Sequence, residues 1–328
     1  MSDMGIGRPP DDRWKDAYGW VAQVSPECMY PPDYRRLDGV VDYHMHVGFG
    51  RLDPIAQMKL ASRAGMRGVN FKISQFPSVE LARTTNRATN EWAEREGLRP
   101  AEAFGALVLG PLVGGINLRL VRRIIAIGGR TIWLPVLESA QHLEHALGYS
   151  RDEARRLGTY ILNGGRLIPE VVELVKIVAD ADVALSVGHL GPEESAAVAE
   201  EMQKIGFKKG FCDHPFDPPL ALSEQNIYDL ANAGLHLNWT WFELSQFVGI
   251  DPRAMAQVTR KVGVDKIMLS TDACIPAFPD SVEGMRMMIE TFSTLGFTDE
   301  ELRKMHSLNA CRLLGVEPYP PLPKANSA

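Results

Sequence analysis

Cysteines, basic tracts and long apolar runs are scarce in this sequence. Its four cysteines are scattered over 328 residues without a C-x-x-C pair, which argues against a zinc ribbon or disulfide framework and for a reducing compartment. The net charge is −6 and no Lys/Arg tract is evident, so we expect no nucleic-acid partner. No apolar stretch reaches the ~20 residues that span a bilayer, so we expect no membrane contact. Residues 1–14 show no apolar secretory segment, and we expect a cytoplasmic protein.

Short apolar runs alternate with amphipathic segments along most of the chain. We predict eight strands, at 40–46, 68–74, 104–110, 131–138, 183–189, 210–214, 235–240 and 266–272. Helices between them begin with signals such as Asp251-Pro252 and end at glycines such as Gly65 and Gly263. This alternation predicts an α/β fold, a single-domain (β/α)8 TIM barrel. The alternative is a doubly wound open sheet, but no Gly-x-Gly-x-x-Gly loop follows the first strand.

We place the barrel at residues 37–316. Residues 1–36 would form an N-terminal extension that packs on the barrel, and the proline-rich residues 317–328 a flexible C-terminal tail.

Asp42-Tyr43-His44-Met45-His46 ends the first predicted strand. Because side chains alternate across a strand, His44 and His46 should point the same way, with Asp42 one layer behind them. Two neutral imidazoles so placed form a pincer for a divalent cation. The alternative is a pair of histidines that merely end a strand.

Polar side chains also end other predicted strands, and chemistry in a TIM barrel lies at the C-terminal ends of its strands. Four of the eight histidines end predicted strands. Besides His44 and His46, the strand-end residues are Lys72, Glu138, His189, His214 and Asp272. Mixed histidine and carboxylate ligands are typical of catalytic zinc sites. We therefore expect one or two divalent ions, Zn²⁺ first, with Mn²⁺ and Fe²⁺ as alternatives.

Together, the Asp-x-His-x-His segment, Gly188-His189, His214 and Ser270-Thr271-Asp272 resemble the amidohydrolase superfamily. Segments 114–117, 128–135 and 309–315 are similar to a poorly characterised amidohydrolase-related branch of unknown function. The resemblance runs from about residue 40 to residue 315. It implies a metal-dependent (β/α)8-barrel enzyme, usually hydrolytic, and leaves the substrate open.

The resemblance also implies roles for the metal ligands. His44 and His46 would bind the more buried metal. His189 and His214 would bind a second metal, or serve as ligand and substrate contact around one. Asp272 would contact the metal-bound water and move its proton.

The bridging ligand departs from the superfamily pattern. Binuclear members usually place a carbamylated lysine or a glutamate at the end of the fourth strand, where this chain has Glu138. Its strand-end lysine, Lys72, lies on the second strand instead. Lys72 is then either a carbamylated bridge or a cation that holds substrate, and Glu138 either is a ligand or orients one.

Several side chains near the strand ends are candidates for substrate binding. His142 follows the fourth strand and could enter the pocket as a ligand or an acid. Trp239, Trp241 and Phe216 could form an apolar wall, which would favour a substrate with an aromatic part. The alternative is that these aromatics pack the loops together.

Three functions are compatible with these residues. The favoured one is a metal-dependent hydrolase of a small amide, ester or lactone. The second is a metal-dependent non-oxidative decarboxylase of an aromatic or unsaturated acid. The third, a barrel that binds metal or ligand without turnover, is disfavoured by the full set of acid/base residues. Whether the chain forms a homo-oligomer stays open.

Overall fold

The computed structural model describes residues 37–48, 50 and 52–320. The expected N-terminal extension at 1–36 and residues 321–328 of the expected tail lie outside the described residues.

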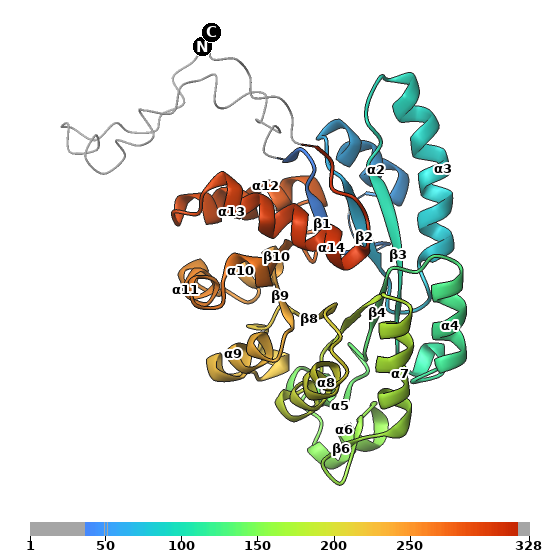
Figure 1. Cartoon of the computed structure of the whole chain (residues 1–328), viewed down its shortest axis with the longest axis vertical. Helices are drawn as coiled ribbons and strands as arrows, with labels where there is room; N and C mark the ends of the chain where they lie inside the picture. Colours follow the sequence, from blue (N-terminus) through green and yellow to red (C-terminus); the bar gives the residue numbers. More distant parts are fainter. Residues whose placement is uncertain (1–36, 49, 51, 321–328) are drawn as a thin grey trace, which may run out of the picture.

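Eight parallel strands close into a barrel, which confirms the predicted (β/α)8 fold (Figure 1). The strands are β1 (Val41–His46), β2 (Gly68–Lys72), β3 (Glu102–Val108), β4 (Thr131–Trp133), β7 (Ala184–Ser186), β8 (Gly210–Asp213), β9 (His236–Thr240) and β10 (Ile267–Ser270). They are hydrogen-bonded in that order. The barrel closes just beyond β10, where the amide of His46 donates to the carbonyl oxygen of Ala273 over 3.1 Å.

Helices surround the barrel and cover the outer face of its strands (Figure 1), and interior side chains cover the inner face, so the strands consist largely of buried residues. The longer helices are α2 (Pro54–Arg63), α3 (Val79–Arg95), α4 (Leu118–Ala126), α7 (Pro169–Asp180), α8 (Pro192–Lys204), α9 (Glu224–Asn232), α11 (Pro252–Val262) and α12 (Ser281–Thr294). Shorter ones are α5 (Ala140–His145), α6 (Arg151–Leu157), α10 (Trp241–Leu244), α13 (Asp299–Arg303) and α14 (Asn309–Leu314). The expected start signals hold: Asp251 accepts the amide of Arg253, with Pro252 as the first helical residue of α11.

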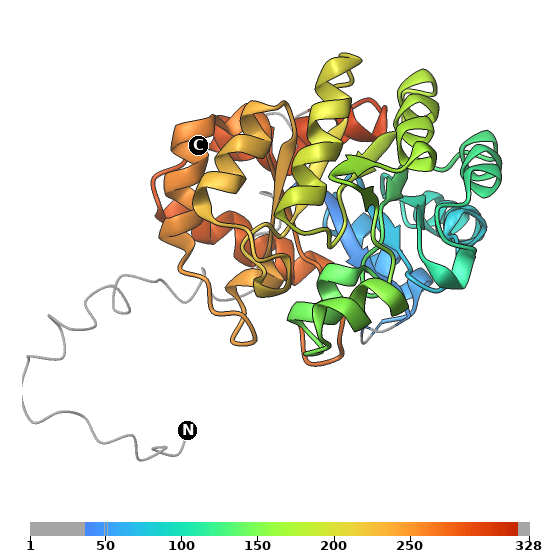
Figure 2. The same ribbon diagram turned by 90° about the horizontal axis from the view of Figure 1, so that it is seen from below.

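The long segment between β4 and β7 contains α6 and a hairpin of β5 (Leu162–Asn163) and β6 (Arg166–Leu167). Gly164 and Gly165 form its turn with φ of +57° and +75°. The nearby α5 carries His142, which meets His189 beyond β7. Thus α5, green in Figure 2, lies across the end of the barrel at which the strands finish.

The fourth strand is shorter than predicted, since β4 ends at Trp133 and not at Glu138. Pro135 has no N–H to offer a neighbouring strand, so the ladder stops before it. The carbonyl oxygen of Pro135 instead accepts the amide of His189 over 3.0 Å. This contact ties the loop after β4 to the loop after β7.

Aromatic side chains fill the barrel interior beneath the strand ends. The ring of Phe211 packs edge-on against Tyr43 at 5.1 Å and Trp133 at 5.9 Å. Buried residues of α14, Cys311 and Leu314 among them, belong to the same cluster. This packed interior gives the polar residues above it a rigid base.

The first residues of the expected tail lie against the barrel. Tyr319 donates its hydroxyl to the carbonyl oxygen of Pro100 over 2.6 Å, and the guanidinium of Arg99 lies 3.9 Å from its ring centroid. Among the described residues, no helix combines the length and apolar character that crossing a membrane requires.

Candidate metal centre

The strand-end side chains converge because three backbone positions adopt unusual conformations. Gly188 has φ +62°, and a Cβ there would lie 2.4 Å from the carbonyl oxygen of Leu134, so only glycine turns the chain toward His189. His214 and Asp272 also have positive φ, at 32° and 51°. Positive φ is uncommon outside glycine and concentrates at functional sites.

His44, His46, Lys72 and Asp272 form one group, here named the β1 cluster. The Nε2 atoms of His44 and His46 lie 3.3 Å apart, and each lies 3.2 Å from Oδ1 of Asp272. In tetrahedral zinc coordination, with bonds of about 2.0–2.1 Å, ligand atoms lie about 3.3 Å from one another. The three atoms therefore fit three corners of such a site.

A buried carboxylate behind His44 sets which imidazole nitrogen faces the cluster. Nδ1 of His44 lies 3.1 Å from Oδ1 of Asp213, so Nδ1 carries the proton and Nε2 keeps its lone pair. Asp213 also accepts bonds from Trp133, Ser186 and Asn238 at 2.5, 2.9 and 2.8 Å. Strands β4, β7 and β9 supply these donors, and such a carboxylate–histidine pair is typical of metal sites.

Lys72 is 1% exposed and lies within this cluster. Its Nζ atom lies 2.9 Å from Nε2 of His44 and 5.5 Å from the ring centroid of Trp133. Burial lowers the pKa of Lys72, which favours a neutral amine. A neutral amine can donate its lone pair to a cation or react with carbon dioxide.

His142, His189, His214 and Asp217 form a second group, the β7–β8 cluster. Nε2 of His189 lies 3.2 Å from Nε2 of His214, and Nδ1 of His189 lies 3.0 Å from Nδ1 of His142. Oδ2 of Asp217 lies 3.8 Å from Nδ1 of His214. His189, His214 and Asp217 thus offer donor atoms within reach of one cation.

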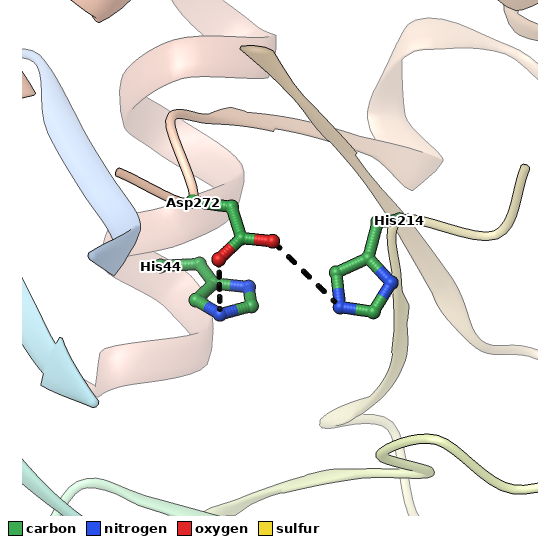
Figure 3. A group of neighbouring side chains, drawn as sticks. All are labelled: His44, His214 and Asp272. Carbon is green, nitrogen blue, oxygen red and sulfur yellow. Dashed lines mark ion pairs between the residues drawn. The ribbon is translucent and has the colours of Figure 1, made fainter. Parts of the chain in front are cut away.

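Asp272 joins the two clusters. Figure 3 shows one oxygen directed toward His44 and the other toward His214; the second distance is 4.0 Å. His44, His214 and Asp272 are all buried and offer donor atoms close enough for one ion. A carboxylate between two histidine groups can serve one ion or two.

The protonation states of the histidines and of Asp272 in the two clusters are those that a divalent cation requires of its ligands. Burial lowers the pKa of His44, His189 and His214, and that of His46 to about 4, so these imidazoles are neutral near pH 7. Burial opposes ionisation of Asp272, but His44 and His46 hold its pKa below the usual range. Neutral imidazoles beside a buried carboxylate match the charge and donor preference of a divalent ion.

Asp42 lies elsewhere than the strand alternation predicts. The pairing of β1 with β2 shifts register between Asp42 and Met45, so simple alternation fails there. Asp42 instead accepts from the hydroxyls of Thr271 and Ser281, both at 2.6 Å. It also accepts the amide of His44 over 3.3 Å. Asp42 therefore anchors backbone of β1, the segment after β10 and the start of α12, whereas Asp213 contacts the His44 ring.

Two other predicted site residues lie away from the clusters. Glu138 comes five residues after the end of β4 and lies against Gly110. Trp239 is fully buried and donates its indole N–H to Thr259 of α11 over 2.9 Å. Neither residue contributes a donor atom to the groups that could hold a metal ion within the described chain.

The predicted aromatic wall is only partly formed. Phe216 stacks on Trp239 at 5.4 Å and so belongs with the core. Trp241 packs edge-on against Phe278 at 5.1 Å. Phe278 and His46 line the same small cavity of about 20 Å³. Trp241 thus belongs to an aromatic group beside the β1 cluster.

Sequence reasoning missed Asp213 and Asp217. Strand alternation sends neighbours to opposite faces, which separates Asp213 from His214, but the positive φ of His214 lets both serve the site. The sequence signal that could have identified Asp213 is its position directly before His214, a predicted metal ligand. Asp217, three residues after His214, carried the same kind of signal.

The fold has known counterparts. The structure is similar to that of an amidohydrolase from Pseudomonas aeruginosa, with a TM-score of 0.58, 16% identity, and coverage of 87% of this chain and 98% of that one. It is also similar to the probable dipeptidase PvdM from Pseudomonas aeruginosa (TM-score 0.59, 14% identity, 89% and 98% covered). A third similar structure is a metallo peptidase from Rhodobacter sphaeroides, liganded with a phosphinate mimic of the dipeptide L-Ala-D-Ala (TM-score 0.54, 14% identity, 85% and 99% covered).

The closed parallel barrel therefore shares its fold with these three structures. A comparison with curated proteins found no match. The chain belongs to the family described as "Family of unknown function (DUF6282)", whose model matches residues 39–238.

Proposed function

We propose that this protein is a metal-dependent hydrolase that cleaves a C–N or C–O bond of a small carbonyl substrate. The observation that carries the proposal is the β1 cluster with Asp213 behind it. Three donor atoms stand at tetrahedral spacing, and a buried carboxylate fixes the tautomer of His44. Groups held this rigidly match a preorganised site.

His44, His46 and Asp272 would hold the first ion, and His189, His214 and Asp217 offer donors for a second. A divalent cation supplies a Lewis acid, which polarises a carbonyl and lowers the pKa of water from ~16 toward ~7. Zinc suits the mixed histidine and carboxylate donors, with manganese and iron as alternatives.

Asp272 has the position and charge of a proton carrier. Its carboxylate is ionised and reaches both clusters, so it can accept the proton of an attacking water and pass it to the leaving nitrogen or oxygen. His214 stands on the other side of Asp272 and can orient the substrate carbonyl through a hydrogen bond. His142 lies 3.0 Å from Nδ1 of His189 and would hold that ring in place through a hydrogen bond.

The aromatic group beside His46 supports an apolar part in the substrate. Trp241 and Phe247 both pack on Phe278, and Phe247 is 56% exposed. Exposed aromatic surface next to polar groups is typical of small-molecule sites. Among amide, ester and lactone substrates, the similarity to dipeptidase folds favours the amide.

The direct test is hydrolysis by the protein reconstituted with zinc or manganese. A panel of N-acyl amino acids, dipeptides, aryl esters and lactones would be assayed before and after removal of metal with a chelator. We expect metal-dependent hydrolysis of at least one class, lost on chelation and restored by metal. Release of carbon dioxide from an aromatic acid without hydrolysis would instead establish the decarboxylase, and metal-independent turnover would refute both.

A second experiment addresses Lys72. Protein equilibrated with ¹³C-bicarbonate would be examined by ¹³C NMR, with Lys72→Met as the control. A carbamate signal present in the wild type and absent from the variant would make Lys72 a bridging ligand and favour hydrolysis at two ions. Its absence would leave Lys72 as an amine that contacts substrate.

A further inference from the structure

A cavity of about 900 Å³ lies at the N-terminal end of the barrel strands. Its lining includes His236, the first residue of β9, and Lys266, which immediately precedes β10. Arg312 of α14 completes one side. The metal centre stands at the opposite ends of the same strands, so this cavity is a separate site.

Cationic side chains outnumber anionic ones around this cavity. The lining contains Lys176, Lys208, Lys209, Lys266 and Arg312, with Asp180, Asp182 and Asp265 as the acids. Two of the acids are already neutralised. A carboxylate oxygen of Asp182 lies 2.6 Å from Nζ of Lys209. A carboxylate oxygen of Asp265 lies 3.3 Å from Nζ of Lys304, which begins the helical turn before α14. The remaining cations exceed the remaining acid, so the cavity attracts anions.

Several of these cations retain unused donors. Among the residues that the structure describes, the exposed Lys208 has no hydrogen bond or ion pair at its ammonium group. Lys266 has one long contact, 3.4 Å to the carbonyl oxygen of Gly234. Arg312 places a single terminal nitrogen against His236, Asp265 and Asn309. Its other nitrogens stay available to a planar or tetrahedral oxyanion.

The positive charges around this cavity also repel one another, which disfavours the protonated forms of Lys266 and His236. Burial, followed by the charges of Lys208 and Arg312, lowers the pKa of Lys266. Burial, followed by the charges of Arg312 and Lys266, lowers the pKa of His236 to about 4. An anion among these groups would relieve this repulsion.

Apolar side chains also line the cavity. They are Ala179, Ile205 and Phe207, and Ile205 is 38% exposed. Small-molecule sites of about 300–1,000 Å³ commonly pair apolar walls with a few charged groups. We propose that this cavity binds a small organic phosphate, with the phosphoryl group among Lys208, Lys266 and Arg312 and the apolar body against Ile205 and Phe207.

The test is isothermal titration calorimetry of the full chain with phenyl phosphate, inorganic phosphate and phenol, after metal removal by a chelator. We expect saturable binding of phenyl phosphate, weaker binding of inorganic phosphate, and none of phenol. Because hydrogen bonds to charged groups are the strong ones, Lys208→Met with Lys266→Met should weaken phenyl phosphate binding at least about tenfold.

The matched control is Lys204→Met with Lys261→Met, which removes the same charge from exposed residues outside the cavity. We expect its affinity to stay within about twofold of the wild type, since surface charges act weakly. His44→Ala with His46→Ala should also bind normally, which places the ligand away from the metal centre. No saturable binding, or equal losses in both lysine pairs, would overturn the proposal and leave the lysines as caps of helix carbonyl ends.

Discussion

Buried histidines occur at both ends of this barrel, but only those at the C-terminal end face one another. His44 and His46 direct their Nε2 atoms at one carboxylate. At the other end, His236 bonds to the carbonyl oxygen of Gly210 and to Arg312, and His306 lies buried in the helical turn 304–308. Burial lowers the pKa of these two histidines as well, to about 4 and about 3.

The comparison shows that burial and a lowered pKa do not by themselves mark a site. What distinguishes the C-terminal end is the convergence of lone pairs on a shared carboxylate, with Asp213 holding one ring in place. We therefore expect substitutions at the two ends to differ. Substitutions of His44 and His46 at the C-terminal end should affect metal binding and turnover, and substitution of His306 at the N-terminal end should affect stability.

The largest expected effect is that of Asp272→Asn. Asparagine keeps the size of the side chain but cannot accept a proton, so kcat should fall by roughly 10²- to 10⁴-fold on any substrate of the wild type. Metal content by mass spectrometry and kcat would be measured together. Glu138→Gln is the control, since Glu138 lies outside both clusters, and it should keep kcat within about threefold. Full activity of Asp272→Asn would remove the proposed proton carrier.

Asp213→Asn should have the next largest effect. The amide can donate to Nδ1 of His44 and so favour the wrong tautomer, and loss of such a partner typically weakens metal affinity by about 10–100-fold. Competition with a chromophoric chelator would measure the affinity. Ser186→Ala removes one donor to Asp213 but keeps the carboxylate, and we expect a much smaller change. Equal affinities in both variants would contradict the role of Asp213.

The buried His306 at the N-terminal end should make the stability of the protein depend on pH. His306 is neutral when folded, with its pKa lowered by burial from 6.5 to about 3. The unfolded chain takes up a proton below pH 6.5, so this contribution to stability is present above that pH and is lost as the pH falls toward 3. Between pH 7 and 5.5 the wild type should lose about 1 kcal/mol more than His306→Gln.

Urea unfolding at several pH values would measure this difference, and the informative quantity is the slope with pH and not the absolute stability of the variant. Parallel slopes for the wild type and His306→Gln would show that His306 titrates normally when folded.

The smallest expected effect separates two neighbouring tryptophans. Trp239→Phe removes the indole bond to Thr259 and should lower stability by about 1 kcal/mol without changing KM. Trp241→Leu removes a ring from the aromatic group on Phe278 and should raise KM with little change in kcat. A raised KM in Trp239→Phe would return that residue to the substrate site.

Much of the fold could be predicted because its signals are local. Strands covered on both faces are apolar runs, and helices between them begin at residues such as Asp251-Pro252. The same logic placed His44, His46, His189, His214 and Asp272 at strand ends. What local pattern could not supply was the exact strand end, so Glu138 was assigned to a strand that stops before Pro135.

The remaining errors come from breaks in strand alternation. The register shift in β1 turns Asp42 toward α12, and the positive φ of His214 brings Asp213 and His214 into one site. Such departures depend on tertiary contacts between strands far apart in sequence. The role of Trp239 was equally hard to predict, because its partner Thr259 lies on α11, 20 residues further along the chain.

The central claim is that the β1 cluster is a metal site, and the most direct test is a crystal structure of protein loaded with zinc. The account predicts an ion bound by Nε2 of His44, Nε2 of His46 and a carboxylate oxygen of Asp272, with Asp213 still bonded to Nδ1 of His44. A well-ordered structure grown in excess zinc with no ion among these three residues would contradict it.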